Sequence, residues 1–366
     1  MPTTISKNIL IAPLDWGLGH TARCIPLIRH VAEQGHHPVV AGNSSQLSFI
    51  QLAIPGVTSI PLEGYNVTYS ALNRFAQLGV LLQLPHIKKV ITAEHEWLSQ
   101  QVSAYHLHGI ISDNRYGLYH AHVPAAILTH QLHVRSGLGR YVDSQVQQIH
   151  YGMLEKFGNV WVPDTAGYTN LGGALSHPRF MPHNTTHIGL LSGFAGKAAT
   201  TGHTLSHLLI LLSGPEPQRT ALAQVLWAQV QDYDGTVVFV EGAETDAPAH
   251  IPPHITWHSR LAGDELLHAM EAASLVICRS GYSTLMDLTA LGKKAIVIPT
   301  PGQTEQEYLA ASLHNQGTFY AARQKDFDLR QTLQASGAFP FRSLPLQNQY
   351  DTYKAVLNDW LNSLPA

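Results

Sequence analysis

The sequence is poor in cysteine and in charged residues. Among its 366 residues, Cys24 and Cys278 are the two cysteines, and they lie in different halves of the chain. This spacing excludes a disulfide scaffold and a cysteine zinc site, and it favours a reducing compartment. Charged residues make up 13% of the chain, and 22 basic against 25 acidic side chains give a net charge of −3. A nucleic-acid-binding protein is therefore disfavoured.

Long apolar runs are also missing. The runs 208–212 and 80–82 are far shorter than the roughly 18–20 residues of a membrane span. The first seven residues lack the charged head and apolar core of an export signal, so we expect a cytoplasmic protein. Residues 74–89 mix apolar side chains with Arg74, Lys88 and Lys89. That pattern is typical either of a buried helix pair or of a segment that binds an anionic lipid surface.

Apolar strand-like segments alternate with helix-like segments along the chain. We expect strands at 8–13, 38–41, 57–62, 109–112, 125–129, 159–162, 207–212, 236–240, 255–257, 274–278 and 295–299. We expect helices at 20–34, 71–103, 218–231, 264–272, 283–291 and 350–364. Such alternation is typical of parallel sheets covered by helices on both faces.

The composition also divides the chain into two halves. Residues 176–204 are rich in small and polar side chains without a clear period, which predicts an interdomain passage. We therefore expect an α/β domain at 1–190, a second one at 205–345, and a closing C-terminal segment at 346–366.

The first strand is followed by a glycine turn. Gly17, Gly19 and Ala22 fit a loose dinucleotide-binding pattern, but residues 42–45 lack the carboxylate that would bind a ribose, which argues against NAD. Glycines before a helix still allow a polar or anionic group to approach the backbone. His20 is placed to point into the same space, although a capping or surface histidine would have the same position.

The second half has a better candidate anion site. The turn at 278–284 follows an apolar strand and opens a helix, so its N–H groups can hold a phosphate. Asp287 lies one turn into that helix, where it can bind a ribose or simply favour the helix N-terminus. Other polar turns at strand ends either bind a donor or are ordinary helix starts. The candidate donor-binding residues are Ser213, Gly214, Arg279, Ser280, Gly281, Ser283, Thr284, Asp287, Glu305 and Gln306.

Polar residues also follow two strands of the first half. Asp113, Asn114 and Arg115 come after one strand, and His130 comes after the next. Asp113 can orient His20, as a carboxylate orients a catalytic imidazole, or it can pair with Arg115 at the surface. With Gly17 and Gly19, the residues Asn114, Arg115 and His130 form a candidate acceptor side.

Two motifs resemble metal sites only superficially. The Asp-x-Asp elements at 232–234 and 326–328 either precede a strand or lie in a weakly periodic stretch, so we expect no metal site. The sequence has no Gly-x-Ser-x-Gly turn, P-loop or His-Glu-x-x-His motif. Common hydrolase and ATPase mechanisms therefore lose their main sequence support.

These residues together resemble the GT-B fold glycosyltransferases, most closely the MurG-type N-acetylglucosaminyltransferases. The specific similarity runs through 276–281, 284–287, 291–292, 298–299, Gln306, Tyr308 and Ala311. The resemblance implies two Rossmann-like domains facing a central cleft, with a UDP-sugar held mainly by the C-terminal domain. It also implies a lipid-linked or cell-envelope acceptor and contact with the inner membrane face.

The resemblance also implies roles for single residues. Ser280 and Gly281 match the phosphate-contacting turn, and Asp287 matches a glutamate that binds the ribose. Gln306 matches an amide that contacts the donor sugar. His20 matches a histidine near the acceptor, and Asp113 resembles the partner acid of a His–Asp pair.

The leading hypothesis is therefore an inverting glycosyltransferase that needs no metal or cofactor besides its UDP-sugar co-substrate. In it, His20 and Asp113 are catalytic, and His20 removes the proton of an acceptor hydroxyl. N-acetylglucosamine is the sugar that the resemblance suggests. Two alternatives stay open: a UDP-sugar epimerase of the same fold, and a non-catalytic subunit that binds a nucleotide-sugar.

Overall fold

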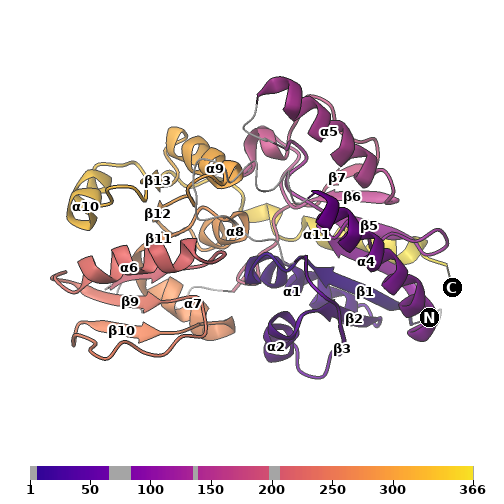
Figure 1. Cartoon of the computed structure of the whole chain (residues 1–366), viewed down its shortest axis with the longest axis horizontal. Helices are drawn as coiled ribbons and strands as arrows, with labels where there is room; N and C mark the ends of the chain where they lie inside the picture. Colours follow the sequence, from indigo (N-terminus) through magenta and orange to yellow (C-terminus); the bar gives the residue numbers. More distant parts are fainter. Residues whose placement is uncertain (1–5, 66–83, 135–138, 198–206, 366) are drawn as a thin grey trace. The chain divides into compact units, whose positions relative to one another are not determined.

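The computed structural model describes residues 6–65, 84–134, 139–197 and 207–365. These residues form two compact units (Figure 1). Unit 1 contains the described residues up to 193 and the C-terminal segment from Asn348, and unit 2 contains those from Phe194 to Gln347. The chain therefore completes unit 2 before its last helix joins unit 1.

Unit 1 is built on a seven-stranded sheet in which all neighbouring strands are parallel. In spatial order the strands are β3 (Thr58–Pro61), β2 (His37–Gly42), β1 (Asn8–Pro13), β4 (Leu107–Asp113), β5 (Ala125–Leu128), β6 (Asn159–Val162) and β7 (Thr185–His187). Most of the central strand residues are buried on both faces, as expected for a parallel sheet between two helical layers.

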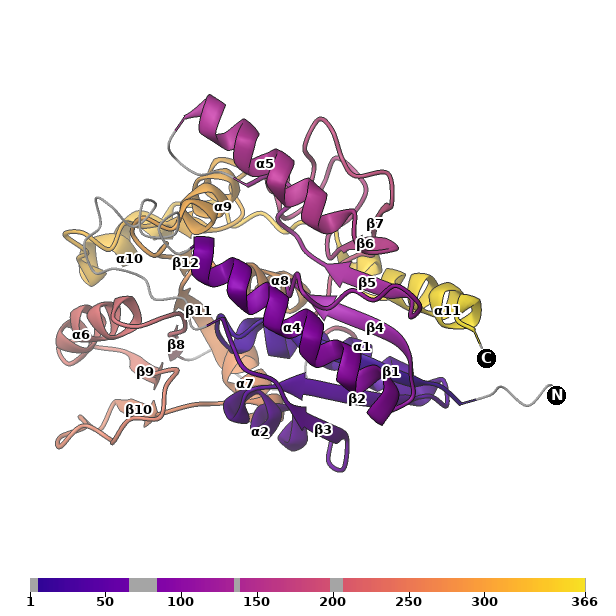
Figure 2. The ribbon, with the colours of Figure 1, turned by 45° about the vertical axis from the view of Figure 1, so that its right-hand side comes forward.

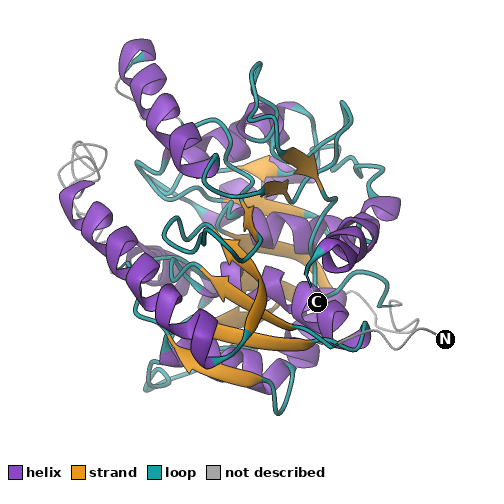
Figure 3. Ribbon diagram, turned by 90° about the vertical axis from the view of Figure 1, so that its right-hand side faces the viewer, coloured by secondary structure: helices purple, strands orange, loops and turns teal. Residues whose placement is uncertain are grey.

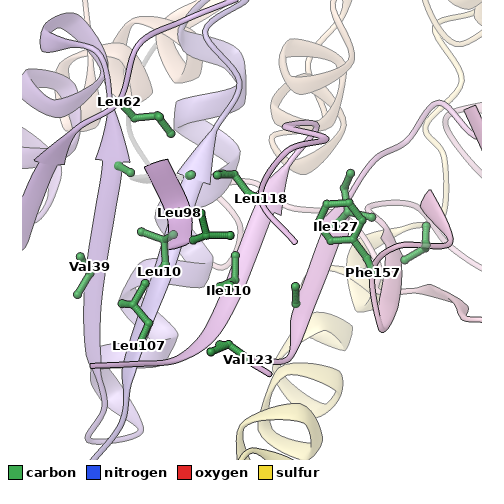
Figure 4. Close-up of a cluster of buried hydrophobic side chains, with 14 of the residues drawn as sticks. Leu10, Val39, Leu62, Leu98, Leu107, Ile110, Leu118, Val123, Ile127 and Phe157 are labelled. Carbon is green, nitrogen blue, oxygen red and sulfur yellow. The ribbon is translucent and has the colours of Figure 1, made fainter. Parts of the chain in front are cut away.

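Helices cover both faces of this sheet (Figure 3). They are α1 (Leu18–Glu33), α2 (Ser44–Ala53), α4 (Leu84–Ala104), α5 (Arg140–Leu154) and α11 (Thr352–Ser363). Because strand side chains alternate between faces, Leu10 and Ile110 pack with Leu98 of α4 in one apolar core (Figure 4).

The C-terminal helix α11 is fastened to unit 1 by polar and aromatic contacts. The Lys7 ammonium donates to the carbonyls of Leu361 and Leu364 at 3.0 and 2.7 Å. The indole of Trp360 meets that of Trp161 on β6 edge to face, with ring centroids 5.4 Å apart. The described end of the chain therefore belongs to the core of unit 1.

Unit 2 repeats the same plan with a six-stranded parallel sheet (Figure 2). Its spatial order is β10 (Ile255–His258), β9 (Thr236–Val240), β8 (His207–Leu211), β11 (Ala273–Cys278), β12 (Ala295–Val297) and β13 (Tyr320–Ala321). Its helices are α6 (Gln218–Val230), α7 (Gly263–Ala272), α8 (Tyr282–Ala290), α9 (Thr304–Asn315) and α10 (Leu329–Gly337). The expectation of two parallel α/β sheets is confirmed.

The structure corrects several sequence-based expectations. Residues 185–187, predicted to lie in the interdomain passage, form β7 beside β6; a three-residue polar strand carries no apolar alternation by which to detect it. No helix was expected after the second strand, but residues 44–53 form α2, which begins with a reciprocal capping box between Asn43 and Gln46. Helix α5 was also missed.

Part of one expected helix lies outside the described residues. The prediction for 71–103 is met from residue 84 onward by α4. Residues 66–83, which include most of the segment 74–89 considered for lipid binding, are not described. In the described parts of the chain, no helix is both long and apolar enough to cross a membrane.

Candidate functional site

Each sheet has a point where successive connections leave in opposite directions. In unit 1, β1 and β4 are adjacent although β2 and β3 come between them in sequence. In unit 2, β8 and β11 are adjacent in the same way. Open α/β sheets bind ligands beyond the carboxyl ends of strands at such switch points. The sequence-predicted site residues follow these strand ends, except for His130 after β5 and Glu305 and Gln306 after β12.

In unit 1, the switch point brings His20 and Asp113 together. Gly17 caps α1 with φ of +95°, a conformation that favours glycine, and His20 lies in the first turn of that helix. Asp113 is the last residue of β4 and is paired in register with Pro13. The Nδ1 atom of His20 is 3.0 Å from Oδ2 of Asp113. The expected neighbourhood of these two residues is therefore present.

Asp113 is fully buried and is held chiefly by Arg23. The Arg23 Nε donates to Oδ2 at 2.9 Å, and Nη2 donates to Oδ1. The Cys24 thiol lies 3.7 Å from Oδ2. Burial opposes ionisation of Asp113, but the charge of Arg23 and the hydrogen bonds from Arg23 and His20 outweigh it and hold the pKa at about 2. Asp113 is therefore a carboxylate at neutral pH.

His20 has the properties of a neutral base. Burial and the positive charge of Arg23 lower its pKa, and Asp113 opposes that shift. Both hydrogen-bond contacts of the ring involve Nδ1, so Nε2 has no hydrogen bond with any described residue. The side chain keeps 16% of its surface exposed. The ring can thus accept a proton at Nε2 while Nδ1 stays inside the protein.

Two candidate acceptor-side residues lie close to this pair. His130 is buried, and its Nδ1 accepts from Arg23 Nη1 at 3.1 Å. Asn114 has φ of +56°, and its Oδ1 is buried without a hydrogen-bond partner among the described residues. Sparsely populated backbone conformations cluster at functional sites, and the unpaired buried oxygen is an acceptor available to a bound group. Gly19 is exposed in the first turn of α1.

Arg115 occupies a different environment from the one expected of an acceptor-side residue. It is fully buried, and its Nε donates to Glu94 of α4 at 2.7 Å. Its remaining nitrogens donate to the carbonyls of Pro13 and Glu63. Asp113 therefore pairs with Arg23 and not with Arg115, and the Arg115 guanidinium joins α4 to the ends of β1 and β3.

In unit 2, three candidate turns follow neighbouring strands. Cys278 of β11 is in register with Leu211 of β8 on one side and Val297 of β12 on the other. The turns after these strands therefore lie at the same edge of the sheet. Gly214, in the turn after β8, has φ of +110° and is exposed, as is Ser213.

The Arg279 side chain binds backbone carbonyls at this edge of the sheet. Its buried guanidinium donates to the carbonyls of Ile298, Pro299 and Gln218 at 2.7–3.2 Å. Burial lowers its pKa to about 10, which still leaves the group charged at neutral pH. Arg279 therefore joins the ends of β11 and β12 to the start of α6.

Ser280 and Gln306 connect two of the turns. The buried Ser280 hydroxyl donates to the Gln306 carbonyl at 2.9 Å, and the Gln306 Oε1 accepts from the Thr300 N–H at 2.8 Å. These bonds fix the start of α9 against the turn after β11. Glu305, in the first turn of α9, is half-buried.

The N-terminus of α8 is the part of this edge suited to an anion. Gly281 caps the helix without a side-chain hydrogen bond, and Ser283 and Thr284 lie half-buried in the first turn. Asp287 lies half-buried one turn further along the same helix. First-turn N–H groups and the helix dipole favour a phosphate there.

Arg23 is the main residue that sequence reasoning missed. It lies three positions after His20 on α1, and residues with that spacing share a helix face. That spacing was a usable signal, but it could not show that the partner carboxylate comes from β4, 90 residues away. Among the described residues, no cluster of histidine, cysteine, aspartate and glutamate suited to a metal ion is found.

Comparison with known families finds a match in the C-terminal part of unit 2. Residues 263–340 match the glycosyltransferase family 28 C-terminal domain. This segment includes the turn after β11, α8, the turn after β12 and α9. The polar strand ends of unit 2 from Arg279 to Gln306 therefore lie within a recognised glycosyltransferase domain.

Known relatives match over a limited part of the chain. A UDP-N-acetylglucosamine–N-acetylmuramyl-(pentapeptide) pyrophosphoryl-undecaprenol N-acetylglucosamine transferase from Caldanaerobacter subterraneus subsp. tengcongensis is 40% identical over 68 residues, which are 18% of this chain and 19% of the relative. A transferase of the same name from Methylobacterium sp. (strain 4-46) is 32% identical over 115 residues, 31% of this chain and 28% of the relative. The matches span less than a third of either relative, and they confirm the MurG-type resemblance.

Solved structures share the fold over the whole chain. The glycosyltransferase SnogD from Streptomyces nogalater is 15% identical with a TM-score of 0.59, and the alignment covers 98% of this chain and 96% of that one. A kitacinnamycin glycosyltransferase is 15% identical with a TM-score of 0.64, covering 99% and 100%. At such low identity the likeness establishes the fold alone, which is GT-B.

Proposed function

We propose that this protein is a glycosyltransferase that moves a sugar from a UDP-sugar to an acceptor hydroxyl with inversion. Unit 2 binds the nucleotide-sugar, and unit 1 supplies the base. The observation that carries the proposal is the coincidence of two independent features. The family 28 match includes the turns after β11 and β12, and β11 is one of the two strands at the switch point of unit 2, where α/β sheets bind ligands.

In this proposal, unit 2 stabilises the leaving group. The departing diphosphate gains negative charge, and the first-turn N–H groups of α8 offer donors and a positive dipole end. Ser283, Thr284 and Asp287 are the side chains of that helix assigned to the donor, and Ser213, Gly214 and Glu305 lie on the neighbouring turns. The hydrogen bonds of Arg279, Ser280 and Gln306 hold these turns together.

The base in this proposal is His20. Its Nε2 accepts the proton of the acceptor hydroxyl as the oxygen attacks the sugar carbon, and the bond from that carbon to the diphosphate breaks. The imidazolium that forms is stabilised by Asp113, 3.0 Å from Nδ1. The names of the curated relatives include an undecaprenol-linked acceptor and N-acetylglucosamine. We extend both to this chain, together with peripheral binding at a membrane, as the first substrates to test.

Donor binding is tested by calorimetric titration with UDP-, GDP-, ADP- and TDP-sugars, beginning with UDP-N-acetylglucosamine and adding no metal. We expect selective binding of a UDP-sugar that weakens at least tenfold in Asp287→Ala. The matched control is Asp234→Ala, because Asp234 is exposed just before β9, at the opposite end of the strands. Absence of binding, or equal losses in both variants, would refute the donor site.

Transfer is tested with the bound donor and undecaprenyl-diphosphate-linked or soluble glycans as acceptors. His20→Ala is expected to lower kcat by 10²–10⁴-fold, as for loss of a general base, with donor affinity unchanged. The control is His37→Ala, an exposed histidine at the start of β2. A new UDP-sugar formed from donor alone would identify an epimerase. Donor binding without any turnover would identify a non-catalytic subunit.

A further inference from the structure

Arg23 connects Asp113, His20 and His130 at the strand ends of unit 1. Its side chain is almost fully buried, and its three nitrogens contact three different partners. Nε and Nη2 bind the Asp113 carboxylate, Nη2 also lies 2.9 Å from His20 Nδ1, and Nη1 lies 3.1 Å from His130 Nδ1. A guanidinium has five donors and no acceptor. Each of these contacts therefore constrains where its partner carries protons.

The two contacts at His20 Nδ1 favour opposite tautomers. If Nδ1 carries the proton, it donates to Asp113 at 3.0 Å and leaves Nε2 free to act as a base. If Nδ1 is bare, it accepts from Arg23 at 2.9 Å and the proton resides on Nε2. Both bonds involve an ionised group and are charge-assisted. Arg23 Nε and Nη2 already donate to Asp113, whereas a bare Nδ1 would place its lone pair 3.0 Å from the carboxylate oxygen Oδ2, so the Nδ1–H tautomer prevails.

We propose that Arg23 is a positioning residue that fixes the Asp113 carboxylate for His20, keeps the His20 ring uncharged and determines the tautomer of His130. The inference rests on the proposed role of His20 as the base, and it adds a third member to the expected pair. The fork of Arg23 is bidentate on Asp113, so the carboxylate cannot rotate away from the imidazole.

The charges around His20 explain why the ring stays neutral. From α1, Arg23 and Cys24 face the cluster, Asp113 comes from β4, and Tyr116 and His130 come from the segments after β4 and β5. Burial raises the pKa of the Cys24 thiol and of the Tyr116 phenol, so neither group adds charge. Arg23 and Asp113 therefore cancel, and protonation of His20 would add an unbalanced charge to a buried cluster.

Arg23 also determines where His130 carries its proton. Because Arg23 Nη1 can only donate, Nδ1 of His130 accepts and its proton lies on Nε2. His130 is then a hydrogen-bond donor at Nε2, while His20 is an acceptor at Nε2. One guanidinium thus gives two neighbouring imidazoles opposite roles.

The test measures both imidazoles directly in the full-length protein. Histidines labelled with ¹⁵N report the tautomer and the pKa by NMR, and His20→Gln identifies the His20 signals among the 23 histidines. We expect the Nδ1–H tautomer at His20 and Nε2–H at His130 in the unaltered protein. Arg23→Met should raise the pKa of His20 by about one unit or more, the usual effect of removing a neighbouring charge.

Two further variants separate charge from geometry. Arg23→Lys keeps the charge without the fork, so the His20 pKa should stay within about half a unit, while kcat falls at least tenfold with the donor KM unchanged. Arg29→Met is the matched control, because Arg29 lies on α1 and donates to the Ala53 carbonyl. It should leave the His20 titration and kcat unchanged.

The outcomes distinguish this inference from the proposed function. An unchanged His20 titration in folded Arg23→Met overturns the inference. If Arg23→Met does not fold, the NMR tautomer of the unaltered protein decides: an Nε2–H tautomer at His20 also overturns the inference. A raised His20 pKa in a protein that transfers no sugar to any acceptor would support the role of Arg23 and refute the transferase. In an active enzyme, the acid limb of the kcat/KM profile should move upward by the same shift as the NMR titration.

Discussion

Replacing Asp113 by asparagine tests the central cluster of unit 1 most directly. The side chain is fully buried and accepts hydrogen bonds from Arg23 and His20. Asparagine keeps the shape but removes the charge, so the buried Arg23 guanidinium loses its counter-ion. Breaking a buried ion pair by removing one partner costs about 3–5 kcal/mol, a large part of the 5–15 kcal/mol that is typical of a domain.

The pH dependence of this loss identifies its cause. The Asp113 pKa is about 2 in the folded protein, against 3.8 for an unperturbed aspartate. The folded pKa is depressed, so the stabilisation is fully present above pH 3.8 and disappears as pH falls through 2. The stability difference between the unaltered protein and Asp113→Asn should therefore shrink by about 2 kcal/mol over that window.

Urea unfolding at several pH values between 2 and 7 measures these quantities, and steady-state kinetics measures kcat. We expect kcat to fall by 10²–10⁴-fold, because asparagine no longer stabilises the imidazolium. The matched control is Asp164→Asn. Asp164 is equally buried at the end of β6, but it accepts from neutral donors that include Leu171 N–H and the Ser176 hydroxyl.

Asp164→Asn should lower stability without the kinetic defect of Asp113→Asn. The reasoning is refuted if Asp113→Asn loses less than about 1 kcal/mol at neutral pH, well below the expected cost of a broken buried pair. It is also refuted if the stability difference does not change between pH 4 and 2, or if kcat stays within twofold of the unaltered protein in an active preparation.

Two further predictions concern unit 1. Burial lowers the pKa of His150 to about 4 in the folded protein. As pH falls, this imidazole is therefore protonated at a higher pH in the unfolded chain than in the folded protein. The free energy of unfolding should drop by about 3 kcal/mol between pH 6.5 and 4, and urea titrations of His150→Gln should lack that part of the slope. In Gly109→Ala, the new Cβ would lie 2.7 Å from the Trp360 ring. The melting temperature should therefore fall by the equivalent of about 1–3 kcal/mol. Adding Trp360→Phe should restore part of this loss, and a double variant without any recovery would contradict the contact.

The sequence alone determined the architecture and located the polar turns of unit 2 that form the candidate donor site. Buried parallel strands are continuous apolar runs, so segments such as 236–240 and 159–162 were located to the residue. The turn after β11 could be found because its glycine, its hydroxyls and the helix that follows are neighbours in the chain. Features of this kind can be predicted because the residues that form them are neighbours in the sequence.

Tertiary structure decided which charged groups meet. His20 and Asp113 were expected to pair, but Arg23 was not expected to bind both of them. Arg115 was expected on the acceptor side, or paired with Asp113 at the surface, but it is buried and pairs with Glu94 of α4. The choice of partner depends on which strand ends are adjacent and on which side chains lose contact with water, and neither is fixed by spacing along the chain. The sequence therefore determined the elements and the chemistry available at their ends, and folding determined the ion pairs, because a buried charge requires a specific partner in space.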